Sequence, residues 1–351
     1  MNKSFYIDKD IDEIIFRSKS NLSKLSGKHI VLTGGRGFLG RYFCEIFHRY
    51  NKNKTKPIKL TVIDNLAISG KLGAKWPKYK NFIFKKKDAS KIFKVDGKVD
   101  YFIHAAGIAS PYYYRKYPIE TLDIAVNGLK NILENAKSKK AKVVFFSSSE
   151  IYGDPDEKYI PIKETYRGNV TTMGPRACYD ESKRLGETLC YIYREKYKVD
   201  INIIRPFNVY GPGMQQTDYR VLPNFASKIK SKKKLLIYGT GNQTRTYCYI
   251  SDAMTGFLKV LTNGKSGEAY NIGNPKPEIS VSNLFLIIKK LNKNKIAYKL
   301  IKHPNSYPTD EPQRRCPDIS KAKREINYRP QVKLKDGLKR FLEWTNENYK
   351  S

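Results

Sequence analysis

Runs of apolar residues alternate with helical segments along most of the chain. From Lys28 onward, short strand-like runs are followed by longer stretches in which apolar positions have helical spacing. This alternation is typical of a parallel sheet covered by helices on both faces, and so of an α/β fold. The predicted strands are His29–Thr33, Lys59–Ile63, Phe82–Phe84, Tyr101–His104, Lys142–Ser147 and Asn202–Arg205. The predicted helices between them are Gly37–Tyr50, Ile119–Lys137 and Tyr179–Lys196.

The pattern changes at both ends of this region. Residues 1–26 are predicted to form a lead-in outside it, with one short helix over Asp10–Ser18. After Arg205 the alternation breaks, because clusters of Pro and Gly separate shorter segments. We therefore expect a lead-in at 1–26, a doubly wound parallel sheet at 27–205 and a smaller C-terminal α/β lobe at 206–351. Since no clean boundary separates the last two parts, we expect them to exchange segments.

Composition narrows the class of protein. The chain has 351 residues, 40% of them apolar, which is enough to build a full-sized core. No stretch approaches the roughly 18 to 20 uninterrupted apolar residues of a membrane-spanning helix, and the polar start does not resemble a signal peptide. We therefore expect a cytoplasmic protein that does not interact with membranes. The five cysteines are scattered without a Cys-x-x-Cys pair, which predicts reduced thiols and no metal site.

The formal charge of +34 is consistent with affinity for nucleic acids, because basic surfaces attract phosphate backbones. The lysines, however, are spread from end to end rather than gathered in a stripe. This distribution argues against a specific nucleic-acid partner. A positive field would also help to gather a small substrate that carries several negative charges.

The first predicted strand runs into a glycine-rich turn and then into a helix. Gly34, Gly37 and Gly40 let the backbone approach a pyrophosphate, which rests against N–H groups at the helix start. Their spacing differs from the dehydrogenase pattern Gly-x-Gly-x-x-Gly. The second strand, however, leads into Asp64, in the place where a carboxylate binds the adenosine ribose. Together these features favour a Rossmann-type dinucleotide site over an ordinary loop, and NAD over NADP, because an acid repels a 2′-phosphate.

A second set of residues carries acid–base chemistry. Tyr179 and Lys183 are four residues apart in a predicted helix, so the ammonium would lie beside the phenol and lower its pKa toward neutrality. Such a phenol could act as a general base. The serines and Glu150 of Ser147–Glu150 follow a predicted strand, at the edge of a parallel sheet where ligands bind. Either motif alone is weak, since the chain has 26 tyrosines and serines are common in turns; their order after the glycine turn favours a catalytic site.

With these motifs in this order, the chain resembles extended short-chain dehydrogenases/reductases of the nucleotide-sugar epimerase, dehydratase and decarboxylase group. The resemblance runs from about His29 to the C-terminus and is closest to UDP-glucuronate decarboxylases. The supporting stretches lie at 101–111, 147–155, 174–184, 205–212, 243–252, 271–274 and 314–318.

The resemblance implies a role for each matching residue. Tyr179 would take the proton of the sugar C4 hydroxyl while hydride passes to NAD, Ser148 would bond the developing keto oxygen, and Lys183 would hold the ribose. The implied catalytic residues are Ser148, Ser149, Glu150, Tyr179 and Lys183. The implied cofactor contacts are Gly34, Gly37, Phe38, Leu39, Gly40, Asp64, Asn65, Asp88, Ala105, Ala106, Tyr179, Lys183 and Pro206. The implied contacts with a nucleotide sugar, a UDP-sugar first of all, are Ser110, Pro111, Glu150, Asn208, Arg220, Leu222, Phe225, Arg245 and Arg315.

The pair Ser149-Glu150 separates the reactions of this group. Similar 4,6-dehydratases carry Asp-Glu, where the Asp protonates the leaving hydroxyl; a serine is a poor acid, so elimination of water loses its proton donor. The resemblance therefore favours decarboxylation of UDP-glucuronate. Epimerisation at C4, which uses the same Ser/Tyr/Lys set, and 4,6-dehydration stay open as alternatives. A binding module without turnover is disfavoured by the intact Tyr179 and Lys183. Members of the group pair through two helices, here Ile119–Lys137 and Tyr179–Lys196, so the resemblance also implies a homodimer.

Overall fold

A seven-stranded parallel sheet forms the centre of the larger part of the molecule. The computed structural model describes residues 4–69, 79–293, 296–301 and 312–351. Every neighbouring pair of strands in the sheet is parallel. In spatial order the strands are β11 (Ala269–Ile272), β6 (Ile201–Pro206), β5 (Lys142–Phe146), β4 (Tyr101–His104), β1 (His29–Thr33), β2 (Lys59–Asp64) and β3 (Phe82–Lys86). The chain runs outward from β1 in both directions, which confirms the predicted Rossmann-type sheet and places a crevice at the carboxyl ends of β1 and β4.

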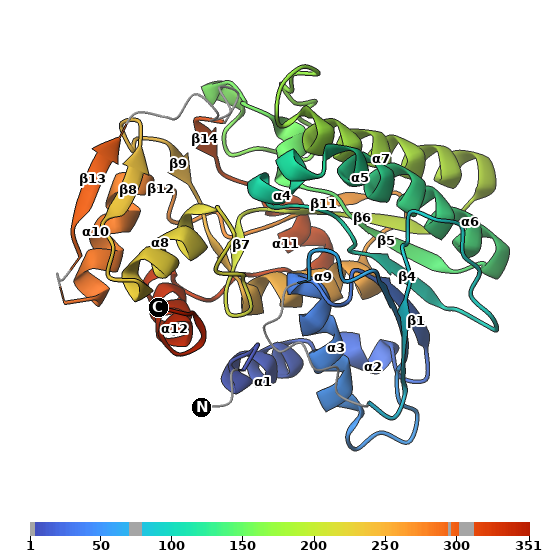
Figure 1. The fold of residues 1–351 in the computed structure, drawn as a ribbon. Helices are drawn as coiled ribbons and strands as arrows, with labels where there is room; N and C mark the ends of the chain where they lie inside the picture. The colour runs from blue at the N-terminus through green and yellow to red at the C-terminus, as the bar shows by residue number, and fades with distance from the viewer. Residues whose placement is uncertain (1–3, 70–78, 294–295, 302–311) are drawn as a thin grey trace.

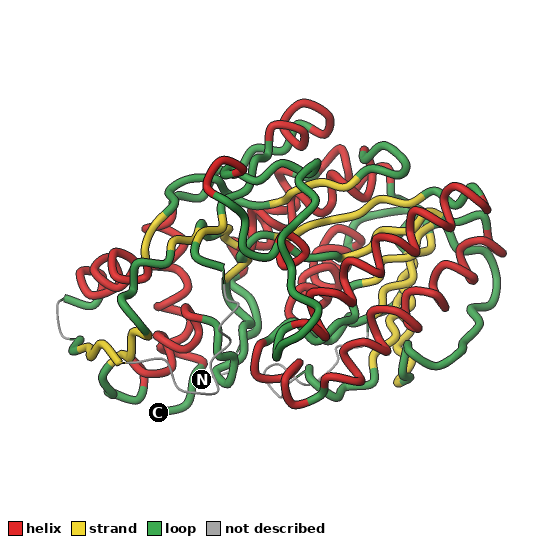
Figure 2. Tube along the Cα trace, turned by 90° about the horizontal axis from the view of Figure 1, so that it is seen from above, coloured by secondary structure: helices red, strands yellow, loops and turns green. Residues whose placement is uncertain are grey.

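Helices cover both faces of this sheet (Figures 1 and 2). Alternate residues of β1 face opposite sides, since Ile30 and Leu32 belong to one apolar cluster and Val31 to another. Both faces are therefore buried, as a parallel sheet requires. One side carries α3 (Phe38–Asn51) and α9 (Ile250–Asn263), with α1 (Asp8–Arg17) and α2 (Lys19–Lys24) packed on them. The other side carries α5 (Pro118–Asp123), α6 (Leu129–Lys139) and α7 (Ala177–Tyr197).

The remaining elements form a smaller lobe and its connections. Figure 1 shows α8, α10, β8 and β13 grouped at one end of the molecule, away from α6 and α7. Two parallel strands, β8 (Leu235–Tyr238) and β13 (Tyr298–Ile301), pair there. The helices beyond the sheet are α4 (Pro111–Lys116), α8 (Val221–Lys230), α10 (Val281–Leu291), α11 (Ser320–Ile326) and α12 (Leu334–Asn348). The short strands are β7 (Val209–Tyr210), β9 (Thr244–Arg245), β10 (Cys248–Tyr249), β12 (Ile279–Ser280) and β14 (Arg314–Arg315).

Three details differ from the sequence-based elements. The lead-in contains two helices rather than one, and it is packed into the main core, where Ile11, Ile14 and Leu22 are fully buried. The single helix predicted over Ile119–Lys137 is interrupted by a π-helical turn over Ile124–Gly128. The larger sheet also contains a strand that was not among those predicted, β11, which comes from beyond residue 206 and lies beside β6.

Each helix in the described ranges falls short of the length and apolar character needed to cross a membrane.

Candidate functional site

The glycine turn is built for close approach of its own backbone segments. Gly34 has a φ of +73°, and a Cβ atom added there would lie 2.7 Å from the Cα of Ala106. A Cβ added to Gly40 would lie 2.2 Å from the carbonyl oxygen of Gly34. A side chain at Gly34 would therefore force apart the segments that follow β1 and β4, and one at Gly40 would push the start of α3 away from the turn. Gly37 precedes the first residues of α3, Phe38 and Leu39, so the helix N-terminus opens onto the turn. This cradle suits the pyrophosphate of a dinucleotide.

Asp64 lies at the end of β2, next to this turn. Its Oδ2 accepts a hydrogen bond from the backbone N–H of Arg36 at 2.9 Å, and its Oδ1 accepts one from Leu66 at 2.8 Å. Burial raises the pKa of Asp64, although these two bonds work in the opposite direction. The backbone thus fixes the carboxylate at the mouth of the glycine turn, where the sequence predicts contact with the adenosine ribose. The adjacent Asn65 side chain accepts a hydrogen bond from the N–H of Ala67 at 3.0 Å.

Replacing Asp64 by Ser is expected to weaken the preference for NAD over NADP at least tenfold. At ~4 Å and an effective dielectric constant of about 20, two like charges repel by roughly 4 kcal/mol, more than a tenfold effect requires. The ratio of kcat/KM values for the two nucleotides measures the change. Asp96→Asn, an exposed acid in a loop, is the control; equal preference in Asp64→Ser and the wild type would rule out contact with the ribose.

The other predicted cofactor residues lie at neighbouring strand ends. Ala105 and Ala106 follow β4, and their N–H groups donate to the carbonyl and the hydroxyl of Thr33 at the end of β1. Asp88 follows β3, and its Oδ1 accepts hydrogen bonds from the backbone and hydroxyl of Ser90. Pro206 ends β6. Their positions after parallel strands agree with ligand contact at that edge, which remains a prediction for each of them.

The hydroxyl cluster and the Tyr/Lys pair meet after β5. Tyr179 lies in the first turn of α7, and a hydrogen bond joins its phenol to the hydroxyl of Ser148. One turn later, the Nζ of Lys183 donates to the backbone oxygen of Phe146 at 2.7 Å. The ring of Tyr114 stacks on that of Tyr179 at 5.4 Å between centroids. Three of the predicted catalytic side chains therefore lie together at the carboxyl end of a central strand.

The protonation of this pair differs from the prediction. Burial raises the pKa of Tyr179 to about 12, although its hydrogen bond with Ser148 works in the opposite direction. Burial also lowers the pKa of Lys183 to about 8, against the attraction of Glu187. The prediction that Lys183 brings the pKa of the phenol toward neutrality is therefore wrong for the protein alone. Desolvation of the phenolate outweighs the hydrogen bond with Ser148 and the charge of Arg220.

Glu150 lies between two arginines. Its carboxylate pairs with both terminal nitrogens of Arg315, one of them at 2.8 Å, and with Nη2 of Arg176. Burial alone would raise the pKa of Glu150, but Arg315 and Arg176 together hold it at about 2. The group is therefore a permanent anion and a very weak base. Its neighbour Ser149 is buried in the 3-10 turn that follows β5.

A second ion pair lies close to the phenol. Asp218 accepts from Arg220 through both of its oxygens, Oδ2 from Nη2 at 2.5 Å and Oδ1 from Nε at 3.1 Å, and the hydroxyl of Ser110 lies 3.5 Å from the same carboxylate. The charge of Arg220 lowers the pKa of Tyr179 against the effect of burial, so this guanidinium lies near the phenol. Pro111 begins α4 immediately after Ser110. The predicted substrate residues Ser110 and Arg220 thus meet at the mouth of the site, in the company of an acid.

The remaining predicted substrate residues are placed differently. The Nδ2 of Asn208 is buried and has no hydrogen-bond partner among the described residues, which suits a donor awaiting a ligand. Leu222 and Phe225 on α8 are buried in the main core cluster. Arg245 donates to the backbone oxygens of Thr244, Pro312 and Gln313, so it anchors the segment that leads to Arg315. Contact of these residues with a substrate stays a prediction.

Sequence reasoning missed four charged residues around the site. Arg176 lies within the stretch 174–184, but its partner Glu150 is 26 positions away in the sequence. Asp218 lies in a loop, where no regular spacing indicates its pairing with Arg220. Glu187 accepts from Ser147 at 2.6 Å and pairs with Arg205 at 2.5 and 2.9 Å, bracing the end of β5 from α7. The spacing of Lys183 and Glu187, one helical turn, was the signal that could have revealed this brace. Among the described residues, His, Cys, Asp and Glu do not gather in any group of three that could hold a metal ion.

Comparison with known proteins agrees with this geometry. Residues 30–273 match the model of the NAD dependent epimerase/dehydratase family. The chain is 36% identical over 314 residues to UDP-glucuronic acid decarboxylase 6 of Arabidopsis thaliana, covering 89% of this chain and 87% of that protein. It is 36% identical over 326 residues to UDP-glucuronic acid decarboxylase 1 of Xenopus tropicalis, covering 92% of this chain and 73% of that protein.

A solved structure gives the same result for the fold. An epimerase from the methanogen Methanothermobacter thermautotrophicus superposes with a TM-score of 0.80 at 26% identity, covering 97% of this chain and 96% of that one. The glycine cradle, the buried Tyr/Lys pair and the matched family model lie on the same part of the chain. The chain belongs to the NAD-dependent epimerase/dehydratase family and is an NAD-dependent enzyme that modifies nucleotide sugars.

Proposed function

We propose that the enzyme decarboxylates a UDP-linked uronic acid, UDP-glucuronate, through a 4-keto intermediate. The observation that carries the proposal is the pairing of Glu150 with Arg176 and Arg315. A dehydratase needs a base at this position, and a carboxylate whose pKa is about 2 is a very weak one. Ser149 likewise offers no acid for the departure of water. The relatives with 36% identity are named as UDP-glucuronic acid decarboxylases, which supports the same choice.

The donors of this cluster suit an acidic sugar. Arg176 and Arg315 share the carboxylate of Glu150, and Arg176 also lies 3.5 Å from the carboxylate of Asp180, so the charges of these four groups balance. The Nε of Arg315 is buried without a hydrogen-bond partner among the described residues, so a charged donor is left for a ligand. Hydrogen bonds from a charged donor to a carboxylate are stronger than those to a neutral hydroxyl. This donor therefore favours a uronic acid over a neutral hexose.

The residues of the site divide the chemistry among them. Bound NAD supplies the hydride acceptor. Tyr179, in its phenolate form, receives the proton of the C4 hydroxyl, and the Ser148 hydroxyl donates to the oxygen as it becomes a ketone. That ketone is β to the C6 carboxylate, so the electrons of the breaking C5–C6 bond pass into an enolate as carbon dioxide leaves. The hydroxyls of Ser148 and Tyr179 stabilise the enolate oxygen until a proton returns to C5. The 4-keto pentose is then reduced by return of the hydride to C4, or it is released.

Incubation of the purified protein with NAD and UDP-glucuronate tests the proposal. We expect release of carbon dioxide and a product lighter by the mass of carbon dioxide if the hydride returns to C4, or by that mass and two hydrogens if the ketone is released. The Tyr179→Phe protein serves as the background control. A product of unchanged mass but altered stereochemistry would replace the proposal with 4-epimerisation. A product lighter by one water would mean that Ser149 and Glu150 support elimination after all.

The rate is expected to fall as the pH rises through about 8. Lys183 has its pKa lowered to about 8 by burial, so the ammonium is present below that pH and lost above it. Glu187 raises the pKa of Lys183, and Glu187→Gln should therefore move the alkaline limb of the profile to lower pH. The measurement is kcat against pH at saturating substrate. A profile that stays flat through this range, or a limb that does not move in Glu187→Gln, would contradict the assignment.

We also propose a homodimer formed through α5, α6 and α7. Apolar side chains remain exposed on this side, since Ile119 is 64%, Leu185 46% and Ile192 43% exposed. Exposed apolar patches of this kind mark protein contacts. Light scattering should give the mass of two chains, and Leu185→Glu should reduce it to one, while Ile83→Glu on β3 should leave the mass unchanged. A wild-type protein with the mass of a single chain would refute the dimer.

A further inference from the structure

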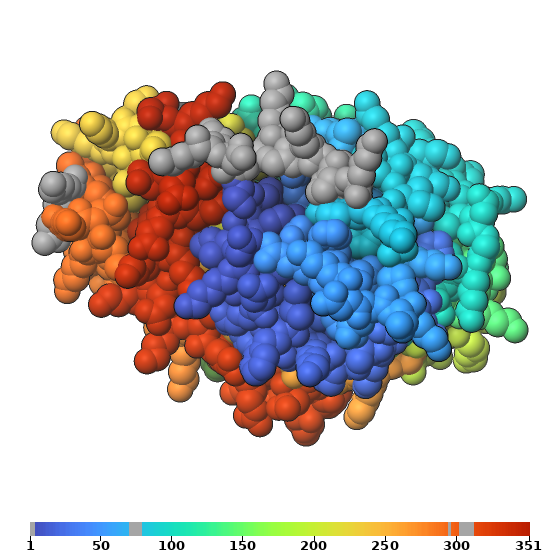
Figure 3. All heavy atoms as spheres, turned by 90° about the horizontal axis from the view of Figure 1, so that it is seen from below, coloured from blue at the N-terminus to red at the C-terminus, as the bar shows by residue number. Residues whose placement is uncertain are grey.

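The lead-in is fixed at its helices to the C-terminal part of the chain. Asp10, fully buried on α1, accepts from Arg340 of α12 at 2.8 Å and from the hydroxyl of Tyr249 at 2.6 Å. Arg17 pairs with the buried Asp252 of α9 at 2.7 Å. In the space-filling view, the surface of the lead-in lies directly beside that of the C-terminal segment (Figure 3). Buried ion pairs that span the two ends of the chain hold α1 in one place.

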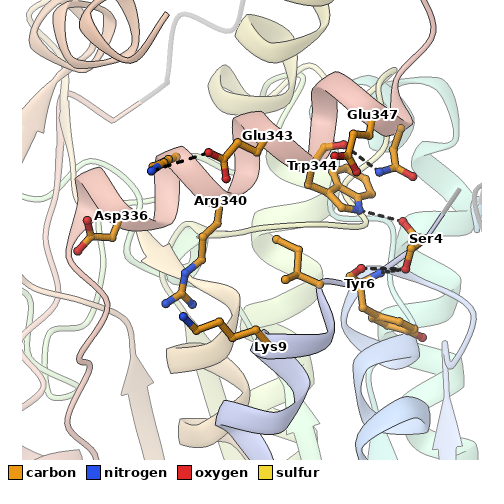
Figure 4. Close-up of a pocket in the computed structure, with 11 residues that line it drawn as sticks. Ser4, Tyr6, Lys9, Asp336, Arg340, Glu343, Trp344 and Glu347 are labelled. Atoms are coloured by element: carbon orange, nitrogen blue, oxygen red, sulfur yellow. Dashed lines mark hydrogen bonds and ion pairs between the residues drawn. The ribbon is translucent and has the colours of Figure 1, made fainter. Parts of the chain in front are cut away.

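The segment before α1 touches α12 at its far end. The indole Nε1 of Trp344 donates to the backbone oxygen of Ser4 at 2.8 Å, and Lys9 lies near Arg340 at the other end (Figure 4). Between these points a hollow of about 620 Å³ separates the lead-in from α12. Residues 4–7 are therefore held to α12 by the bond between Ser4 and Trp344, and their other contacts lie on the side that faces away from the hollow.

On that side, the ring of Phe5 lies between α3 and the loop that contains Gly213. A Cβ added to Gly213 would lie 2.4 Å from a ring carbon of Phe5, so the ring rests directly on the Gly213 backbone, where φ is +91°. The guanidinium of Arg41, on α3, lies 4.7 Å from the centre of the same ring. Tyr42 adds an edge contact at 6.1 Å between ring centres. Phe5 itself is 7% exposed, so the ring fills this space.

Arg41 connects Phe5 to the glycine turn, and Gly213 connects it to loop 211–220. Arg41 donates from Nε to the backbone oxygen of Arg36 at 2.8 Å, within the glycine turn, and the N–H of Arg36 binds Asp64. Gly213 begins the part of loop 211–220 that carries Asp218 and Arg220, and the charge of Arg220 lowers the pKa of Tyr179. The ring thus bridges the cofactor turn and the loop that borders the candidate substrate site.

We propose that Phe5 is a positioning residue that couples the binding of NAD at the glycine turn to the binding of the substrate's nucleotide at loop 211–220. Ordering of either loop by its ligand fixes the ring, and a fixed ring lowers the cost of ordering the other loop. The coupling is reciprocal, because each ligand must change the affinity of the other by the same factor. The inference rests on the nucleotide-sugar site described above and is independent of which reaction follows.

Calorimetric titration of the nucleotide-free protein tests this coupling. NAD is titrated with and without saturating UDP, which carries the nucleotide part of the substrate and undergoes no turnover. We expect UDP to tighten NAD about fivefold or more in the wild type, the lower end of coupling between sites. In Phe5→Ala this factor should fall close to one. Phe16→Ala is the matched control, since Phe16 lies on the same lead-in and is 81% exposed, and it should keep the wild-type factor.

Each outcome bears on the coupling itself. A factor that survives in Phe5→Ala, or a wild type without coupling, overturns the inference. Thermal unfolding of each variant separates a loss of fold from a loss of coupling. If Phe5→Ala does not fold, Phe5→Leu keeps most of the apolar volume without the flat ring, and an unchanged factor in that variant overturns the inference equally. Because no carbon dioxide is measured, an enzyme that proves to be an epimerase leaves the coupling standing; failure of UDP to bind would remove both the coupling and the nucleotide-sugar site.

Discussion

Tyr179→Phe is expected to lower kcat by about 10² to 10⁴ while NAD still binds, because the variant keeps the ring and loses the hydroxyl that accepts the sugar proton. The ring is buried against Tyr114, so phenylalanine fits the same space and the fold should be retained. The measurement is the turnover of UDP-glucuronate alongside the Kd for NAD. Tyr191→Phe, an exposed tyrosine on the same helix, is the matched control.

The result would decide whether the Tyr179 and Lys183 spacing in α7 serves catalysis or only packing. If turnover falls in Tyr179→Phe and persists in Tyr191→Phe, the phenol acts on the substrate. Wild-type turnover in Tyr179→Phe would instead leave the Tyr179 and Lys183 spacing as a packing feature of α7, and the proton would need another acceptor.

Glu150→Gln is expected to lower both activity and stability. The neutral amide leaves Arg176 and Arg315 without their shared anion, and their side chains are 7% and 4% exposed. Removing one partner of such a buried cluster costs roughly 3 to 5 kcal/mol in the free energy of unfolding. Urea unfolding at neutral pH measures this loss, and Glu157→Gln, whose side chain is 88% exposed near Arg314, should change stability by less than about 1 kcal/mol.

The same cluster predicts how the stability of the protein changes as the pH falls. The folded protein holds the pKa of Glu150 at about 2, below the ordinary value of 4.5, so its contribution to stability is present above 4.5 and lost as the pH falls through 2. The wild type should therefore lose more stability over this range than Glu150→Gln does. Equal acid sensitivity of the two proteins would show that the arginines do not stabilise the carboxylate.

The sheet could be predicted from the sequence because its strands are long enough to carry a pattern. The predicted strands match the observed ones to within one or two residues at each end, since each contains a short apolar run. The two-residue strands of the smaller lobe, such as β9 and β14, have no periodicity to detect. The π-helical turn at Ile124–Gly128 arises where α5 and α6 meet α7, so it too depends on tertiary packing.

The candidate site was predictable in part for a similar reason. Glycines, Asp64 and the Tyr179/Lys183 pair lie at short, recognisable spacings. The pairing of Glu150 with Arg315 joins residues 165 positions apart, which no local pattern reveals. The pKa of Tyr179 was predicted in the wrong direction because helical spacing shows a nearby charge but not the depth of burial that opposes it.

The position of β11 late in the sequence affects folding of the protein during its synthesis. Residues 269–272 form the edge strand beside β6, and the backbone N–H of Asn271 donates to Glu164 at 2.8 Å. During synthesis the ribosome has completed more than three quarters of the chain before this strand emerges, so the earlier strands wait with one edge unpaired. Unpaired edges promote aggregation of nascent chains. We therefore expect the nascent chain to need chaperones during the time between synthesis of β6 and synthesis of β11.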